Sequence, residues 1–114
     1  MATYKKLHWT EHSKIKMRQY GLSKIKLFNI LHKPERKEIG IVPGTIAVMK
    51  TNKKYSTSKT AQKRASGEIW LMFKDTKDMR RVISAWRYPG VSKPGEEIPI
   101  PKDIREELLR EKEL

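Results

Sequence analysis

The sequence predicts an α+β domain: two N-terminal helices packed on a three- to four-stranded antiparallel sheet, with a C-terminal helical tail. Apolar residues recur at helical spacing between residues 11 and 32, and shorter β-branched runs follow them. The length of 114 residues leaves room for one domain with a modest core. We therefore expect the domain over residues 1–90. Over residues 91–114 we expect an extended connector, rich in proline and glycine, and a helix.

Capping residues bound the two expected helices. Thr10 is a good N-cap for a helix over Glu11–Tyr20, and Gly21 can end that helix in the left-handed conformation. Ser23 opens a second helix over Lys24–His32, and a proline two residues later prevents its continuation. We expect the apolar face of the second helix to consist of Ile25, Leu27, Phe28 and Leu31.

Extended segments follow the helices. A proline–glycine pair separates the first two, and the turn Asp75–Asp78 joins the last two. The third is a continuous apolar run, typical of a central strand buried on both faces. The expected strands are Arg36–Val42, Thr45–Thr51, Ile69–Phe73 and Arg81–Arg87, and Leu7–Trp9 is expected to be extended.

The tail helix is expected to begin at Lys102 or Asp103. Ile104, Leu108 and Leu109 lie on one side of it. Such an apolar side needs a surface to pack on. The helix therefore either folds back on the body or packs on a partner.

The charge is strongly basic and unevenly spread. The chain has 26 Lys and Arg against 13 Asp and Glu, a formal net charge of +13. Residues 1–95 carry a net charge of +16, and residues 96–114 a net charge of −3. A basic body favours a polyanionic partner, so we expect RNA or the ribosome, with general solubility charge as the alternative.

Several classes of protein are disfavoured. The chain has no cysteine, which excludes a disulfide scaffold and any thiolate zinc site. It has no apolar run near ~18 residues, so we expect no membrane partner. No phosphate-binding loop or clustered carboxylates are present, and we expect no metal and no cofactor. The start of the chain lacks a signal-peptide pattern, which predicts a cytoplasmic location.

Two segments carry candidate catalytic residues. His12 and Lys16 lie one turn apart on the first helix, where an imidazole could move a proton and a cation could stabilise phosphate charge. At the end of the last strand, Arg87 offers a donor fork for phosphate, and Tyr88 offers a ring for stacking or a proton to donate. The structural alternatives are a packed or capping histidine and an arginine stem covering apolar surface.

A basic loop over residues 50–66 carries candidate nucleic-acid contacts. It holds six basic residues, no acid and one aromatic residue. Such a loop can neutralise phosphates and stack on an unpaired base, although a solvated loop is the alternative. The residues assigned to nucleic-acid binding are Lys53, Lys54, Tyr55, Lys63 and Arg64, together with Arg81 on the last strand.

Short motifs resemble a widespread family of small prokaryotic proteins, distantly related to RelE-type toxins of the barnase–EndoU–colicin–RelE ribonuclease group. The motifs are Trp9-Thr10-Glu11-His12-Ser13, Lys16-Met17, Tyr20-Gly21-Leu22-Ser23 and Arg81-Val82-Ile83-Ser84-Ala85-Trp86. The resemblance covers roughly residues 7–88 and implies the same fold. It aligns the family histidine with His12 and the strand Thr or Ser with Ser84. The family arginine falls on Lys16, which keeps the charge without the fork, and a basic residue falls on Tyr20, which has no charge.

The leading hypothesis is an RNA-binding, toxin-like protein that is a candidate metal-independent endoribonuclease. In this mechanism the 2′-hydroxyl attacks the adjacent phosphate, His12 acts as base or acid, and Lys16 and Arg87 stabilise the charge that develops. Ser84 and Tyr88 complete the site. The alternatives are a non-catalytic RNA- or ribosome-binding module, and a protein-interaction domain masked by an acidic, antitoxin-like partner.

Overall fold

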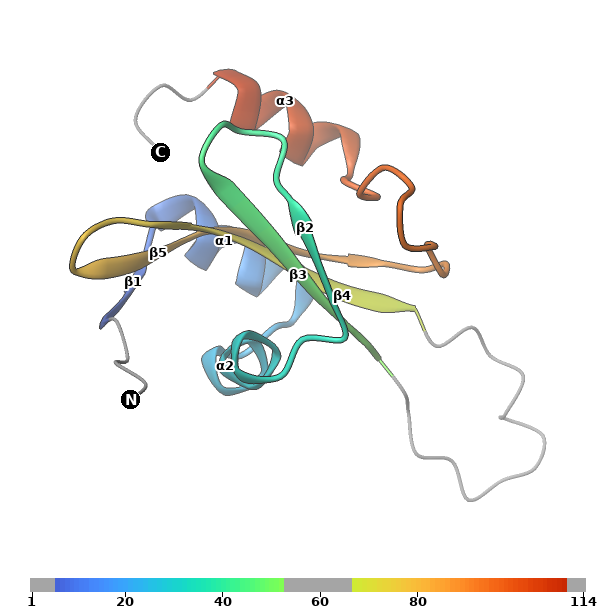
Figure 1. Ribbon diagram of the computed structural model, residues 1–114, viewed down its shortest axis with the longest axis horizontal. Helices are drawn as coiled ribbons and strands as arrows, with labels where there is room; N and C mark the ends of the chain where they lie inside the picture. The colour runs from blue at the N-terminus through green and yellow to red at the C-terminus, as the bar shows by residue number, and fades with distance from the viewer. Residues whose placement is uncertain (1–5, 53–66, 111–114) are drawn as a thin grey trace.

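The computed structural model describes residues 6–52 and 67–110, which form three helices and a five-stranded sheet (Figure 1). The strands are β1 (Lys6–Trp9), β2 (Arg36–Ile39), β3 (Thr45–Thr51), β4 (Glu68–Asp75) and β5 (Met79–Tyr88). The helices are α1 (Glu11–Tyr20), α2 (Lys24–His32) and α3 (Lys102–Arg110). The predicted α+β class is confirmed. None of the helices in these ranges has the length and apolar character needed to cross a membrane.

The sheet has the strand order β1-β5-β4-β3-β2. The prediction of three to four antiparallel strands is too low, because β1 adds a fifth strand that runs parallel to β5. The other neighbouring strands are antiparallel. A strand of four residues carries almost no periodicity, so the sequence alone could indicate only an extended segment there.

The helix boundaries follow from the capping residues, as predicted. The Thr10 side chain accepts a hydrogen bond from the Ser13 N–H, and Ser23 does the same for Lys26. Gly21 ends α1 at φ 66°, a left-handed conformation that costs glycine little because it has no Cβ.

The helices cover both faces of the sheet (Figure 1). On one face, α1 and α2 pack on the sheet in a core that includes Leu27 and Leu71. On the other face, Leu108 of α3 packs in a core with Trp70 and Trp86, whose rings stack with centroids 6.3 Å apart. The central run of β4 is buried on both faces, as predicted.

The apolar face predicted for α2 is only partly right. Leu27 and Ile30 are buried and Leu31 is half-buried, whereas Ile25 is 75% exposed and Phe28 49% exposed. At 3.6 residues per turn, Ile25 and Phe28 lie on the side of the helix opposite Leu27 and Ile30. The sheet can contact only one of these sides.

A bulge in β5 sets the direction of Ser84. Ile83 has no partner in β4, whereas Val82 pairs with Phe73 and Ser84 pairs with Met72. Regular alternation would place Val82 and Ser84 on the same face. Val82 packs in the core on the α1–α2 side, and Met72 in the core beneath α3. The extra residue therefore turns Ser84 to the α3 side.

The connector between β5 and α3 is tied to the sheet by buried polar groups. The Trp86 indole N–H donates to the Pro99 carbonyl at 2.9 Å. The buried Glu68 carboxylate accepts from the Ser92 N–H at 2.9 Å and the Ser92 hydroxyl at 2.7 Å. Arg36 donates to Ser92 Oγ at 2.6 Å and to the Glu96 carbonyl at 3.0 Å. Of the two arrangements predicted for the tail helix, the structure has the one folded back on the body.

Candidate functional site

Helix α1 runs beside the second half of β5, in line with β1. The Thr10 N–H donates to the Val82 carbonyl at 3.2 Å, His12 contacts Ser84, and Arg87 reaches the last residue of α1. These contacts follow both segments in the same direction. The α1 side chains that turn toward α3 therefore lie next to Ser84, where the bulge has placed it.

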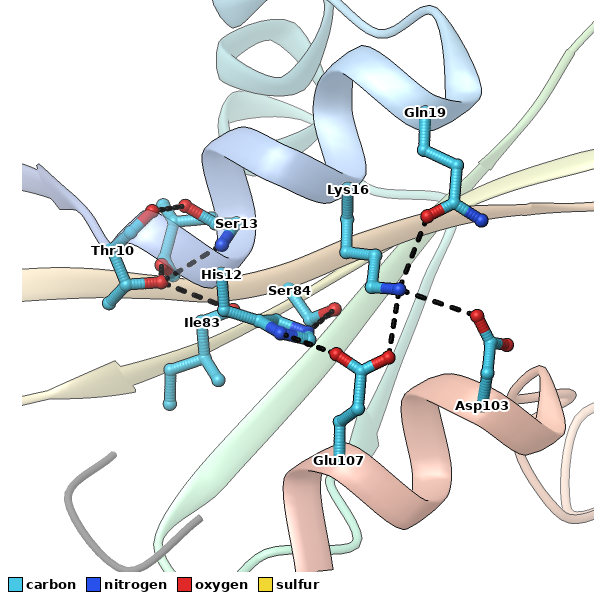
Figure 2. Close-up of polar contacts among 10 residues, drawn as sticks. Thr10, His12, Ser13, Lys16, Gln19, Ile83, Ser84, Asp103 and Glu107 are labelled. Atoms are coloured by element: carbon cyan, nitrogen blue, oxygen red, sulfur yellow. Dashed lines mark hydrogen bonds and ion pairs between the residues drawn. The ribbon is translucent and has the colours of Figure 1, made fainter. Parts of the chain in front are cut away.

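His12 lies between a hydroxyl and a carboxylate. Its Nε2 is 3.0 Å from Ser84 Oγ, and its Nδ1 is 3.1 Å from Glu107 Oε2 on α3 (Figure 2). A carboxylate can only accept, so Nδ1 carries a proton. In the neutral ring, Nε2 then accepts a hydrogen bond from the Ser84 hydroxyl. The structure thus brings together His12 and Ser84, two residues predicted as site residues, and adds Glu107.

Lys16 is held by the same carboxylate. Its Nζ donates to Glu107 Oε1 at 3.0 Å, to Gln19 Oε1 at 3.2 Å and to Asp103 Oδ2 at 3.3 Å (Figure 2). Only 6% of the Lys16 side chain is exposed. Burial lowers the pKa of Lys16, but the hydrogen bonds and charges of Glu107 and Asp103 outweigh it and raise the pKa above its usual value.

The pKa of Asp103 is shifted in the opposite direction. Burial raises the pKa of its carboxyl group, but the hydrogen bond and charge of Lys16, together with hydrogen bonds from backbone N–H groups of α3, outweigh this and leave the pKa below its usual value. Lys16 is therefore a cation with anionic partners throughout the neutral pH range. His12, Lys16, Asp103 and Glu107, together with Ser84, form what we call the α1–α3 polar network.

Ser84 is fully buried. The order hydroxyl, imidazole, carboxylate is that of a hydrolase triad, in which the hydroxyl must reach the substrate. Ser84 has no exposed surface from which to do so. In this arrangement its hydroxyl orients the His12 ring rather than serving as a nucleophile.

Arg87 and Tyr88 lie apart from His12. Arg87 donates from Nε to the Tyr20 carbonyl at 2.7 Å and from a terminal nitrogen to the Gly21 carbonyl at 3.2 Å. It therefore caps the C-terminus of α1, where a cation is favoured. Tyr20 is eight residues beyond His12, about 12 Å along the helix. Tyr88 is half-buried against the core beneath α3. The structure does not bring these two residues to the His12 imidazole.

Arg81 belongs to a row of basic side chains across three strands. It pairs with His8 of β1 on one side and with Lys74 of β4 on the other. The neighbours Trp9, Phe73 and Val82 pack on the α1–α2 side, so alternation places this row on the α3 face. Arg81 and Lys74 have no ion pair among the residues that the structure describes. We call His8, Arg81 and Lys74 the cationic row, after the charges of its arginine and lysine.

The other predicted nucleic-acid contacts, Lys53, Lys54, Tyr55, Lys63 and Arg64, lie outside the described residues. Within the described ranges, no group of three or more His, Asp or Glu side chains is arranged to hold a metal ion.

The sequence hypothesis missed the two carboxylates of the α1–α3 polar network. Asp103 and Glu107 are four residues apart, a spacing that places both on one face of α3. His12 and Lys16 have the same spacing on α1. The two spacings are visible in the sequence, but only the fold shows that these faces meet.

Comparison with protein-family models, with curated proteins and with solved structures finds no match. The relationship to RelE-type toxins therefore stays a prediction from the sequence motifs.

Proposed function

We propose that this protein binds RNA at the β1–β5–β4 edge of its sheet, on the face that also carries α3. The cationic row is the observation that supports this most directly. It aligns His8, Arg81 and Lys74 in register across three neighbouring strands, and none of them faces an acid in that row. RNA phosphates are the anions that such a row fits in a protein with a net charge of +13.

The arrangement of the row is costly without an anion. Arg81 and Lys74 lie directly opposite each other in an antiparallel pair, and like charges at such positions destabilise a sheet. Arg80, next along β5, is instead paired with Asp75 at 2.8 Å. The chain thus neutralises one arginine with a carboxylate and leaves the next beside a lysine. A bound phosphate backbone would remove the repulsion.

The first test removes the row. We expect the double variant Arg81→Ala with Lys74→Ala to bind a single-stranded oligoribonucleotide at least about tenfold more weakly, because two phosphate contacts are lost. Its melting temperature should not fall, because the substitutions also remove a repulsion. Fluorescence anisotropy and thermal unfolding measure the two effects.

The matched control is Lys26→Ala with Lys37→Ala, which removes two exposed charges from α2 and β2. Its affinity should stay close to that of the parent. An equal loss of RNA affinity in the control would contradict the assignment of RNA binding to the row, because binding would then depend only on the total charge.

RNA cleavage is the second candidate function. The adjacency of His12 to Lys16 favours it, because a proton-transfer group lies beside a cation. Once Glu107 turns away, the ring proton would sit on Nε2 and donate to Ser84 Oγ, so that Nδ1 could take the proton from the 2′-hydroxyl. The 2′-oxygen would then attack the neighbouring phosphate. The bond between phosphorus and the 5′-oxygen breaks, and the proton held by His12 passes to the leaving 5′-oxygen, which gives a 2′,3′-cyclic phosphate and a 5′-hydroxyl. Lys16 would stabilise the negative charge that develops on the phosphate oxygens in the transition state.

Incubation of the protein with RNA in the presence of a chelator tests this reaction. We expect cleavage that His12→Ala slows by about 10²–10⁴-fold, the usual contribution of a general acid–base group. His32→Ala, on the exposed side of α2, should cleave at the parent rate. If the parent leaves the RNA intact, or if His12→Ala matches it, catalysis is excluded and the binding function remains.

A further inference from the structure

The Glu107 carboxylate uses each of its oxygens on a different donor of α1. Oε2 faces His12 Nδ1 at 3.1 Å, and Oε1 accepts from Lys16 Nζ at 3.0 Å (Figure 2). A phosphate group also presents two oxygens from one central atom, and the same pair of donors would bind it. We propose that the Glu107 carboxylate occupies a phosphate subsite of the RNA-binding surface, formed by His12 and Lys16, from which a phosphate of bound RNA displaces it.

The subsite donors are fixed on the body of the protein. Thr10 hydrogen-bonds to β5 at the start of α1, and Arg87 binds the carbonyls at its end. The helix that carries His12 and Lys16 is therefore anchored by contacts that do not involve Glu107. The occupant, in contrast, comes from α3, which follows a proline-rich connector.

Glu107 can leave without any movement of α3. Its side chain is 39% exposed, and that of Asp103 is 53% exposed. Solvent therefore reaches the network from the carboxylate side. A change of side-chain rotamer would turn Glu107 outward, while Ile104 and Leu108 stay buried on the sheet.

The subsite is continuous with the cationic row. Arg81 lies three residues before Ser84 on β5, about 10 Å along the strand, and Ser84 contacts His12. An RNA strand bound along the row would pass the α1–α3 polar network, where His12 and Lys16 lie. This inference rests on the proposed RNA-binding function and identifies one phosphate position within it.

The test compares two neighbouring glutamates. Glu107→Gln removes the competing charge with little change in shape, and we expect it to bind a single-stranded oligoribonucleotide about tenfold more tightly, because a charged donor is freed. Glu106→Gln is the matched control. It removes the same charge from the same helix, at an exposed position with no contact to the network, and should change the affinity less than twofold.

A double-mutant cycle tests whether the gain in RNA affinity arises at the subsite. Adding Lys16→Met to Glu107→Gln removes the freed donor, and the affinity should return close to that of the parent. Asp103→Asn, which also frees Lys16 from a carboxylate, should tighten binding by a smaller factor and serves if Glu107→Gln does not fold.

Three results would overturn the inference: no gain in Glu107→Gln, an equal gain in Glu106→Gln, or a gain that survives Lys16→Met. Any of these, with normal binding by the parent, leaves the proposed function standing. Absence of binding by the parent and by every variant would overturn both.

Discussion

Glu107 is the residue on which the α1–α3 polar network converges. Its two oxygens bind two different side chains of α1. Removal of one partner from such a partly buried network leaves the remaining charges poorly satisfied. The network therefore restricts how α3 can sit on the sheet, in addition to the effect on RNA binding that we propose for it.

Asp103 makes this restriction dependent on pH. Burial raises its pKa, but the hydrogen bond and charge of Lys16 and the hydrogen bonds from backbone N–H groups of α3 together leave the pKa in the folded protein below the usual aspartate value. A carboxyl group with a depressed pKa stabilises the fold above the unfolded pKa, and this stabilisation is lost as the pH falls through the folded pKa. We expect thermal unfolding between pH 5 and 2 to show a smaller loss of melting temperature in Asp103→Asn than in the parent.

Asp78→Asn, in the exposed turn between β4 and β5, is the control and should follow the parent curve. The account of Asp103 is wrong if its variant and the parent lose stability in parallel over this range.

At the scale of elements, α3 is held mainly by its apolar side. Ile104 and Leu108 are 0% and 1% exposed on a sheet face that includes Trp70 and Trp86. Without α3, this aromatic surface would be open to solvent. The helix is therefore part of the core as well as the carrier of the two network carboxylates.

Adjacent leucines of α3 allow a matched comparison. We expect Leu108→Ala to lower the free energy of unfolding by about 2–5 kcal/mol, because it opens a cavity beneath the helix. Leu109→Ala makes the same change at a side chain that is 63% exposed, and should stay within about 0.5 kcal/mol of the parent. Denaturant unfolding measures both, and equal losses would mean that α3 does not pack as described.

Local signals in the sequence were sufficient for most elements. The caps Thr10, Ser23 and Gly21 gave the bounds of α1 and α2, because they act on their own helix ends. The bulge at Ile83 carries no comparable local signal, and its effect depends on how β5 pairs with β4. Contacts between distant segments, such as Glu107 with His12, likewise require the fold.

At the scale of the whole molecule, the fold shows where the uneven charge of the sequence lies. Residues 1–95 carry a net charge of +16, and the tail from residue 96 carries −3. Two acids of this tail bind His12 and Lys16, whereas the cationic row has no acid of its own among the described residues. The sequence indicated a polyanion partner from the total charge. Only the sheet register shows which three side chains align for one.

The salt dependence of RNA binding tests the central claim most directly. Each phosphate contact on a single strand contributes about 0.7 to the slope of log affinity against log salt. We predict that Arg81→Ala with Lys74→Ala has a slope shallower than the parent by about 1.4, and that Lys26→Ala with Lys37→Ala keeps the parent slope. One common slope for all three proteins, or no binding by the parent at low salt, would contradict the account.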